Sequence, residues 1–215
     1  MERLGYDRYV AQGGDIGAAV SSTLGGRAGP GIIAVHVNQP FILPKPPYKN
    51  PTADEQRMLD RVAVLGADET AYAAIQMTRP QTLGYGLADS PIGQAAWIYE
   101  KLAAWSDCDG DPEELFGLDR MLDNISIYWF THSATSAARF YWENRANGIQ
   151  AIPINVPAGC SIFPKELYLA PRSWAERYIP KLMYWNELEK GGHFAAFEQP
   201  ELFVAEVRAC FSVVR

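Results

Sequence analysis

An acidic side chain stands between small residues in the segment Gly13-Gly14-Asp15-Ile16-Gly17, where a short strand predicted at residues 8–12 gives way to a helix. This small-x-nucleophile-x-small spacing is that of a nucleophile elbow, a sharp turn in which the backbones of strand and helix come close together. The turn would expose the Asp15 carboxylate, and the backbone N–H of Ile16 would face a negative charge that develops on a bound substrate. An aspartate that caps a helix after a glycine-rich turn has the same pattern, so the segment alone leaves both interpretations open.

A histidine that could act as a base stands in the segment Gly191-Gly192-His193-Phe194, after the last predicted strand at residues 181–185. Sites in α/β proteins lie at the carboxyl ends of strands, and the flanking glycines leave the loop free to present the ring. His36 and His132 lack such a setting, and we interpret them as structural residues. A nucleophile early in the chain and a histidine late is also the order found in α/β-hydrolase folds.

A third group must orient the histidine, and Glu166 is our candidate because it follows the strand predicted at residues 151–157. A solvated surface carboxylate is the commoner role of a glutamate. Glu176, Glu187 and Glu189 compete with Glu166 on composition alone, so the residues by themselves leave the orienting acid open.

The order of predicted elements favours a parallel sheet interrupted by a helical insertion. Residues 31–38 form a second predicted strand, reached through a stretch of small residues suited to a helix. Five prolines between residues 40 and 51 predict an extended connector, since proline neither continues a helix nor pairs within a central strand. Further helices are predicted from the capping box of Thr52 and Glu55 onward, at residues 68–78, from Ser90-Pro91 onward, and at residues 118–130, 133–144 and 200–214.

Composition and charge exclude several classes of protein. The 215 residues carry 25 acidic and 19 basic side chains, and the net charge of −6 offers no electrostatic footprint for nucleic acid or anionic lipid. No apolar run approaches the roughly 18–20 residues that span a bilayer, and the first residues lack the apolar core of a signal peptide. Cys108, Cys160 and Cys210 are too far apart for a Cys-x-x-Cys zinc site or a disulfide framework. We therefore expect a protein of the cytoplasm.

Several longer segments stand in a characteristic order: Leu4-Gly5-Tyr6 through Gly13-Gly14-Asp15-Ile16-Gly17, Ser126-Ile127-Tyr128-Trp129, Arg139-Phe140-Tyr141-Trp142-Glu143-Asn144, Phe163-Pro164-Lys165-Glu166, Pro171-Arg172-Ser173-Trp174 and Gly191-Gly192-His193-Phe194-Ala195-Ala196-Phe197-Glu198. Together they resemble the microsomal-type epoxide hydrolases along essentially the whole chain, and the last segment is the most specific. The resemblance implies the C-terminal part of an α/β-hydrolase fold, with a mostly parallel sheet and a helical cap inserted between strands. The core would comprise residues 1–40, with the nucleophile strand, and 150–215, with the acid and the histidine. The cap would comprise residues 41–149.

The resemblance also implies a role for each candidate residue. Asp15 corresponds to the family's nucleophile, Glu166 to its charge-relay acid and His193 to its general base. Tyr72 and Tyr141 correspond to the two cap tyrosines that hold the epoxide oxygen. The Asp15 carboxylate would open the strained ring and form an ester, which water activated by His193 would hydrolyse to a diol. No metal or redox cofactor is implied.

Two features depart from the family's pattern. The family usually has tryptophan after the nucleophile, where this chain has Ile16. The contribution there is mainly the backbone N–H, so we expect Ile16 to change the shape of the pocket and to keep its place as an oxyanion donor. The family's N-terminal part, which includes the first strands and a His-Gly-x-Pro loop with another oxyanion donor, has no counterpart in this chain. The chain would then be a fragment, a product with a start recorded too far downstream, or a pseudoenzyme.

Substrate and partners follow from the same resemblance. An aromatic-rich cap, with Trp97, Trp105, Trp129 and Trp142, can line an apolar pocket for a hydrophobic epoxide, although most of these rings are expected in the cap core. Water and a small epoxide are the expected partners, detoxification or aromatic hydrocarbon catabolism is the expected setting, and a homo-oligomer is left open. The alternatives are an inactive remnant that serves as a binding module and a haloalkane dehalogenase. Ile16 disfavours the latter because those relatives bind halide through a tryptophan there.

Overall fold

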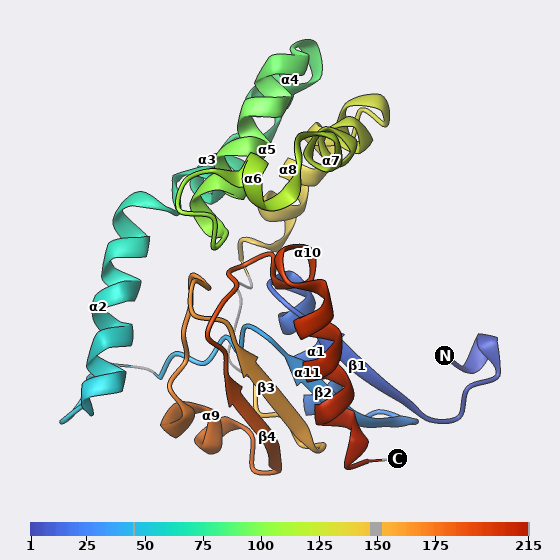
Figure 1. The fold of residues 1–215 in the computed structure, drawn as a ribbon, viewed down its shortest axis with the longest axis vertical. Helices are drawn as coiled ribbons and strands as arrows, with labels where there is room; N and C mark the ends of the chain where they lie inside the picture. The colour runs from blue at the N-terminus through green and yellow to red at the C-terminus, as the bar shows by residue number, and fades with distance from the viewer. Residues whose placement is uncertain (45, 147–151, 215) are drawn as a thin grey trace. The chain divides into compact units, whose positions relative to one another are not determined.

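The computed structural model describes residues 1–44, 46–146 and 152–214, and the chain divides into two compact units. The sheet unit comprises Met1–Val62 and Ile149–Arg215, and the helical unit comprises Ala63–Gly148. All strands among the described residues belong to the sheet unit (Figure 1). The limits of 41–149 for the cap stay a prediction.

The described residues form one sheet of parallel strands in the order β1 (Tyr9–Gly13), β2 (Ile32–Val37), β3 (Ala158–Ile162) and β4 (Leu182–Glu187). The last residue of β1, Gly13, pairs with the last residue of β2, Val37, and Ile162 of β3 pairs with Glu187 of β4, whereas β3 runs two residues beyond its pairing of Cys160 with Val37. Parallel strands bring their carboxyl ends to one edge, so the segments that follow them can meet there.

The third strand lies later in the chain than the sequence predicted. The prediction of a strand at residues 151–157 is wrong, since β3 begins at Ala158, and residue 151 lies outside the described residues. Pro153 and Pro157 have no N–H to donate to a neighbouring strand, which explains why the earlier segment does not form a strand. The β3 sequence Ala-Gly-Cys-Ser-Ile contains a single β-branched residue, yet all five residues are buried. The other three predicted strands overlap β1, β2 and β4.

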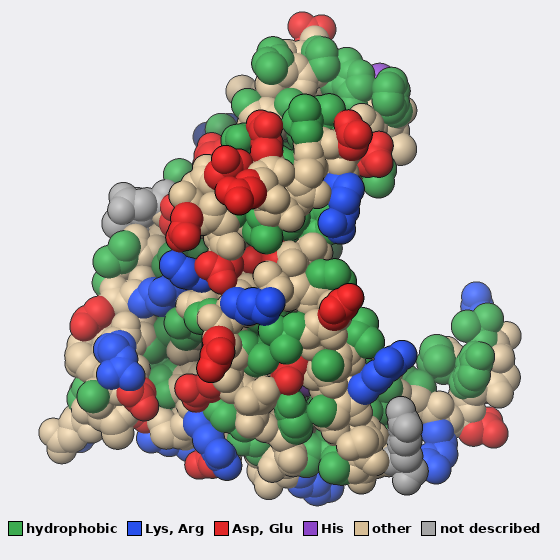
Figure 2. All heavy atoms as spheres, viewed as in Figure 1, with side chains coloured by type: hydrophobic (Ala, Val, Ile, Leu, Met, Phe, Trp, Pro, Cys, Tyr) green, Lys and Arg blue, Asp and Glu red, His purple; other side chains and the backbone are tan. Residues whose placement is uncertain are grey.

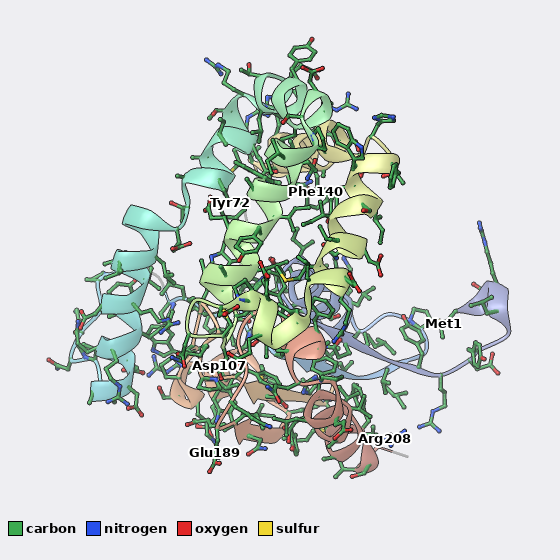
Figure 3. The ribbon with its side chains drawn as sticks, turned by 45° about the horizontal axis from the view of Figure 1, so that its top comes forward. Met1, Tyr72, Asp107, Phe140, Glu189 and Arg208 are labelled. Carbon is green, nitrogen blue, oxygen red and sulfur yellow. The ribbon has the colours of Figure 1, made fainter. Side chains whose placement is uncertain are left out.

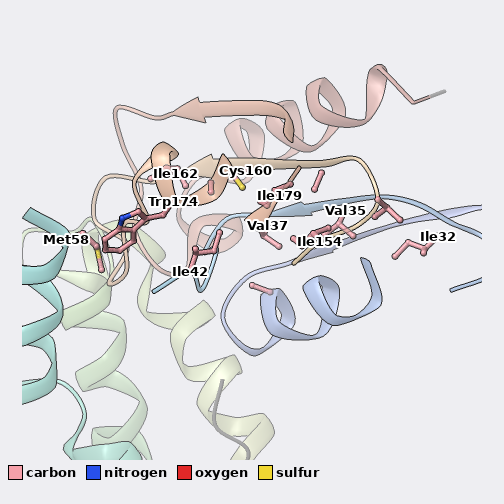
Figure 4. Close-up of a cluster of buried hydrophobic side chains, with 14 residues drawn as sticks. Ile32, Val35, Val37, Ile42, Met58, Ile154, Cys160, Ile162, Trp174 and Ile179 are labelled. Atoms are coloured by element: carbon pink, nitrogen blue, oxygen red, sulfur yellow. The ribbon is translucent and has the colours of Figure 1, made fainter. Parts of the chain in front are cut away.

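Helices cover both faces of the sheet. Val35 and Val37 of β2 pack with Trp174 in a large apolar cluster (Figure 4), whereas Ala34 packs with Phe211 in a smaller one. Side chains that alternate along a strand explain why neighbours on β2 enter different clusters. The fold is therefore α/β, as predicted. The helices of the sheet unit are the 3-10 helix Glu2–Leu4, α1 (Ile16–Arg27), α9 (Arg172–Tyr178), α10 (Ala195–Glu198) and α11 (Pro200–Ser212), and α2 (Ala53–Asp68) begins in it.

A buried polar network joins the sheet to α11. Ser161 of β3 donates a hydrogen bond to Oε2 of Glu206 at 2.7 Å, and its oxygen lies 2.9 Å from Nε2 of His36 on β2. Tyr184 and Asn186 of β4 donate to the same carboxylate. Burial lowers the pKa of His36 to about 4, against the opposing effect of the Glu206 charge. This neutral, packed ring agrees with the interpretation of His36 as a structural residue.

The sequence predicted several helix starts from local signals. Thr52 and Glu55 form the predicted capping box, with the Glu55 N–H donating to Oγ1 of Thr52 and the Thr52 N–H to Oε2 of Glu55. Ser90 caps the next predicted start by accepting the N–H of Gly93 at 3.0 Å. The helix predicted at residues 68–78 begins later, at Ala71. The helical unit contains α3 (Ala71–Thr78), α4 (Pro80–Asp89), α5 (Pro91–Trp105), α6 (Pro112–Phe116), α7 (Leu118–Phe130) and α8 (Ala134–Asn144).

The surface carries mixed charge. On the face drawn in Figure 2, Lys and Arg side chains lie among acidic and apolar ones rather than in one continuous basic area. Cys108, Cys160 and Cys210 are free thiols. None of the helices in the described ranges is long and apolar enough to cross a membrane.

Candidate active site

The turn between β1 and α1 has the backbone geometry of a nucleophile elbow. Asp15 has φ 48° and ψ −129°, a left-handed conformation that is strained for a residue with a side chain. A Cβ on Gly13 would lie 2.0 Å from the carbonyl oxygen of Gly17, so only glycine fits where strand and helix cross. A Cβ on Gly17 would meet nothing within 4 Å, so the close approach demands a small residue at Gly13 alone. Asp15 is the N-cap residue of α1 but makes no side-chain capping hydrogen bond, which disfavours the simple capping interpretation.

The structure brings Asp15, His193 and Glu166 into one hydrogen-bonded chain. Nε2 of His193 lies 3.2 Å from Oδ2 of Asp15, and Nδ1 lies 2.8 Å from Oε1 of Glu166. The side chains of His193 and Glu166 are 6% and 1% exposed, whereas that of Asp15 is 43% exposed. A partly exposed carboxylate can meet a small molecule, while the ring and its second carboxylate are shielded from water.

The loop after β3 holds Glu166 through contacts that the sequence did not reveal. Oε1 of Glu166 accepts hydrogen bonds from Nε2 of Gln39 at 2.9 Å and from the N–H of Leu167 at 2.7 Å. The guanidinium of Arg61 on α2 donates to the backbone carbonyl of Glu166 at 2.6 Å and to that of Leu167 at 2.8 Å. Gln39 stands two residues after the end of β2, and its place at the carboxyl edge of a strand is the signal that could have identified it.

The histidine loop is fixed against the acid loop. The N–H of Lys165 donates to the carbonyl of Gly191 at 3.0 Å, so the residue before Glu166 is tied to the loop that carries His193. Gly191 has φ +104°, and a Cβ there would lie 2.6 Å from the ring of Phe163. Glycine is required at this position by both its conformation and its space.

The charges and hydrogen bonds of this site change the pKa of the His193 imidazole. Burial of the His193 ring lowers its pKa, but hydrogen bonds to Asp15 and Glu166 and the charges of both carboxylates outweigh that effect and raise the pKa to about 10. At neutral pH the ring is therefore an imidazolium between two carboxylates. Loss of one carboxylate charge would lower this pKa, so the ring could release its Nε2 proton and then act as a base.

The competing glutamates lie elsewhere. Glu176 forms an exposed ion pair with Arg172 at 2.8 Å, and Glu187 and Glu189 are exposed. Within the described ranges, no group of three or more His, Cys, Asp or Glu side chains could hold a metal ion.

The two tyrosines predicted to hold the epoxide oxygen are neighbours within the helical unit. The rings of Tyr72 on α3 and Tyr141 on α8 meet edge to face, with centroids 5.9 Å apart. Nζ of Lys101 lies 4.9 Å from the centre of the Tyr72 ring, and Trp105 packs against the same ring. Figure 3 labels Tyr72 and Phe140, the residue before Tyr141. The roles of both tyrosines stay predictions.

A parallel sheet with an elbow, an acid loop and a histidine loop at the carboxyl ends of its strands defines the α/β-hydrolase fold, and solved structures similar to this chain have that fold. Within this class the chain is similar to epoxide hydrolases. It is 50% identical over its whole length to a protein of Stigmatella aurantiaca (strain DW4/3-1) provisionally named an epoxide hydrolase.

Two solved structures agree in fold with this chain. The juvenile hormone epoxide hydrolase of the silkworm Bombyx mori has a TM-score of 0.87 and 30% identity, covering 99% of this chain and 56% of its own. The Aspergillus niger epoxide hydrolase has a TM-score of 0.82 and 33% identity, covering 100% of this chain and 55% of its own.

These relatives are longer than the chain. The chain spans about half the length of the curated relatives it matches, 49% of the Stigmatella protein and 52% of the epoxide hydrolase 1 of Sus scrofa. No protein-family model matches the chain. The resemblance to epoxide hydrolases is confirmed in sequence and in fold.

Proposed function

We propose that this chain carries the reacting groups of an epoxide hydrolase that opens a hydrophobic epoxide to a vicinal diol through an ester on Asp15. The proposal rests on the hydrogen-bonded chain in which His193 contacts Asp15 of the elbow through Nε2 and Glu166 through Nδ1. A carboxylate at a nucleophile elbow has no acidic proton to give up, so it attacks directly, and the neighbouring histidine is left for a later step.

In the first step an oxygen of Asp15 attacks a ring carbon, and the bond from that carbon to the epoxide oxygen breaks. The oxygen takes a proton from a phenol, the role proposed for Tyr72 and Tyr141. The product is a hydroxyalkyl ester of Asp15. Esterification removes the Asp15 charge, so the pKa of His193 falls. The ring then releases its Nε2 proton and the phenolate takes one up, which restores the phenol and leaves Nε2 able to act as a base.

In the second step His193 takes a proton from water, and the hydroxide attacks the ester carbonyl. The N–H of Ile16, at the first position of α1, would donate to the oxyanion, and Glu166 would balance the imidazolium. The ester bond breaks, and His193 returns its proton to the leaving alcohol. The second proton of the water, left on the Asp15 carboxyl group, passes to His193 and restores the carboxylate beside an imidazolium. One water is consumed for each diol, and Asp15 retains an oxygen from water. The proposed setting is the cytoplasm.

The test is a single turnover of styrene oxide by this chain in ¹⁸O-water, with mass analysis of the diol and of the Asp15 peptide. The proposal predicts an unlabelled first-turnover diol and one ¹⁸O in Asp15. A labelled diol with unlabelled Asp15 would show direct attack by water and overturn the ester step. A folded chain that yields no diol overturns the proposed activity for this chain. Asp15→Asn is the matched control and should yield no first-turnover diol.

A further inference from the structure

Glu198 is a buried carboxylate close to His193 in the chain, and the proposed reaction gives it no role. It ends the short helix α10, and only 7% of its surface is exposed. Its Oε2 accepts the N–H of Gly192 at 2.7 Å, and its Oε1 accepts the N–H of Phe194 at 2.8 Å. The two oxygens of one side chain thus bind the backbone on both sides of His193.

This arrangement requires a carboxylate. Two N–H donors face two acceptor oxygens, and an ionised carboxylate has acceptors on both atoms. An amide would turn an NH₂ group toward one of the two donors. Hydrogen bonds from backbone N–H groups to a charged acceptor are also among the stronger ones, so the loop is held firmly.

Two further anchors of the loop lie before the histidine. Gly191 is tied to Lys165 and packs against Phe163, and both contacts fix where the loop begins. The Glu198 side chain binds the residues directly before and after His193. The direction in which His193 leaves the backbone depends on those two peptide groups.

We propose that Glu198 is a positioning residue that holds the loop so that His193 meets Asp15 through Nε2 and Glu166 through Nδ1 at the same time. The kinetic part of this inference rests on the proposed function, whereas its structural part does not. A histidine displaced by a fraction of an ångström would still sit near Asp15 but would misdirect the water that must reach the ester.

The principal test is Glu198→Gln, compared with the unchanged chain in two measurements. The first is the pKa of His193 from ring NMR signals, which we expect to fall by about one unit as the hydrogen bonds of the ring to both carboxylates weaken. The second is single-turnover kinetics. We expect ester hydrolysis to slow by about 10- to 100-fold, as for other small misplacements of a reacting group, while ester formation changes less than about threefold.

The matched control is Glu206→Gln. Glu206 is a carboxylate of similar burial, 6% exposed, that also accepts several hydrogen bonds in the same unit, but its partners are Ser161, Tyr184 and Asn186. We expect this variant to lower the unfolding temperature without changing the pKa of His193 or the rate of ester hydrolysis. Equal changes in both variants would mean that Glu198 acts on stability alone, which overturns the proposal.

A measurement on the unchanged chain covers the case in which Glu198→Gln does not fold. Hydrogen exchange at neutral pH should show the N–H groups of Gly192 and Phe194 protected, as expected of donors held by the Glu198 carboxylate. Exchange as fast as in a solvated loop would overturn the inference. Should the unchanged chain form no ester, the proposed function fails, while the exchange rates and the pKa of His193 still decide the place of Glu198.

Discussion

His193 touches Asp15 through Nε2 at 3.2 Å, although 178 positions separate the two residues in the chain. The contact joins the loop after β4 to the turn after β1, and the parallel arrangement of the four described strands is what allows it. It also gives the imidazole two states. Beside an ionised Asp15 the ring holds its proton, and beside an esterified Asp15 it can release that proton and act as a base.

The first prediction concerns this second state. His193→Gln should form the Asp15 ester and then stall, because the nucleophile does not need the ring whereas the water does. We expect ester hydrolysis to slow by about 10²–10⁴-fold, the usual contribution of a general base. Intact-protein mass spectrometry after mixing with styrene oxide should show the adduct persisting.

The control for that prediction is the double variant Asp15→Asn with His193→Gln, which should show no adduct at all. An adduct that persists in the double variant would place the alkylated group elsewhere. An unmodified His193→Gln protein together with an active unchanged chain would mean that the ring is needed for ester formation.

The second prediction uses the paired glycines of the elbow. Gly13→Ala would put a Cβ 2.0 Å from the carbonyl oxygen of Gly17, and neither backbone can move away. We expect a loss of about 3 kcal/mol or more in the free energy of unfolding. Urea denaturation followed by fluorescence measures it.

Gly17→Ala is the control in the same turn. A Cβ there meets nothing within 4 Å and lies in a helix, so the substitution should stabilise the fold by about 0.5–1 kcal/mol. Equal destabilisation by both substitutions would contradict the crossing geometry of β1 and α1.

The parts of this site that consist of local sequence patterns could be predicted, whereas contacts between residues far apart in the chain could not. The elbow, the capping box of Thr52 and the histidine loop are local patterns, and the structure places them as expected. Gln39 and Arg61 reach Glu166 across 127 and 105 positions, and nothing near either residue indicates such a partner. Local patterns cannot identify pairs that only the folded sheet brings together.

Strand β3 shows the opposite difficulty. Its small residues have little preference for strands, and the β-branched residues just before it led to the wrong prediction of a strand at residues 151–157. Burial on both faces of a central strand selects small side chains where helices approach closely, as at Gly159, where a Cβ would lie 2.4 Å from the sulfur of Cys210. The elements that pack against β3 determine that this segment forms a strand, so its own sequence could not predict it.

The third prediction is a maximum of stability near pH 6.5. The pKa of His36 is lowered to about 4 in the folded state, so its contribution is complete above the unfolded value near 6.5 and is lost as pH falls toward 4. The pKa of His193 is raised to about 10, so its contribution is complete below 6.5 and is lost as pH rises toward 10. The free energy of unfolding can change by at most about 1.4 kcal/mol per pH unit for each of these two groups.

Urea denaturation from about pH 4.5 to about pH 9.5 measures both the acid limb and the alkaline limb of the stability curve, because this range lies between the folded-state pKa values of His36 and His193. His36→Gln should flatten the acid limb and leave the alkaline limb in place, and His193→Gln should do the reverse. An alkaline limb that survives in His193→Gln would assign it to another group.

The last prediction concerns the roles of Tyr72 and Tyr141, which can be tested by asking whether their loss slows ester formation or ester hydrolysis. Tyr72→Phe and Tyr141→Phe each remove a phenol that would donate to the oxygen released from the ring, so they should slow ester formation. We expect about a 10- to 100-fold effect for each, as for the loss of one hydrogen bond to a charged oxygen. Ester hydrolysis, which depends on His193, should change little. Rapid-quench mass spectrometry of the Asp15 adduct separates the two rates.

Tyr85→Phe is the matched control, because Tyr85 also lies in the helical unit and is 69% exposed. It should leave both rates unchanged. Because the rings of Tyr72 and Tyr141 are in contact, their effects should not add, and the double variant should lose less than the product of the single losses. Slower ester hydrolysis with normal ester formation would place the phenols beside the attacking water, contrary to the role proposed for them.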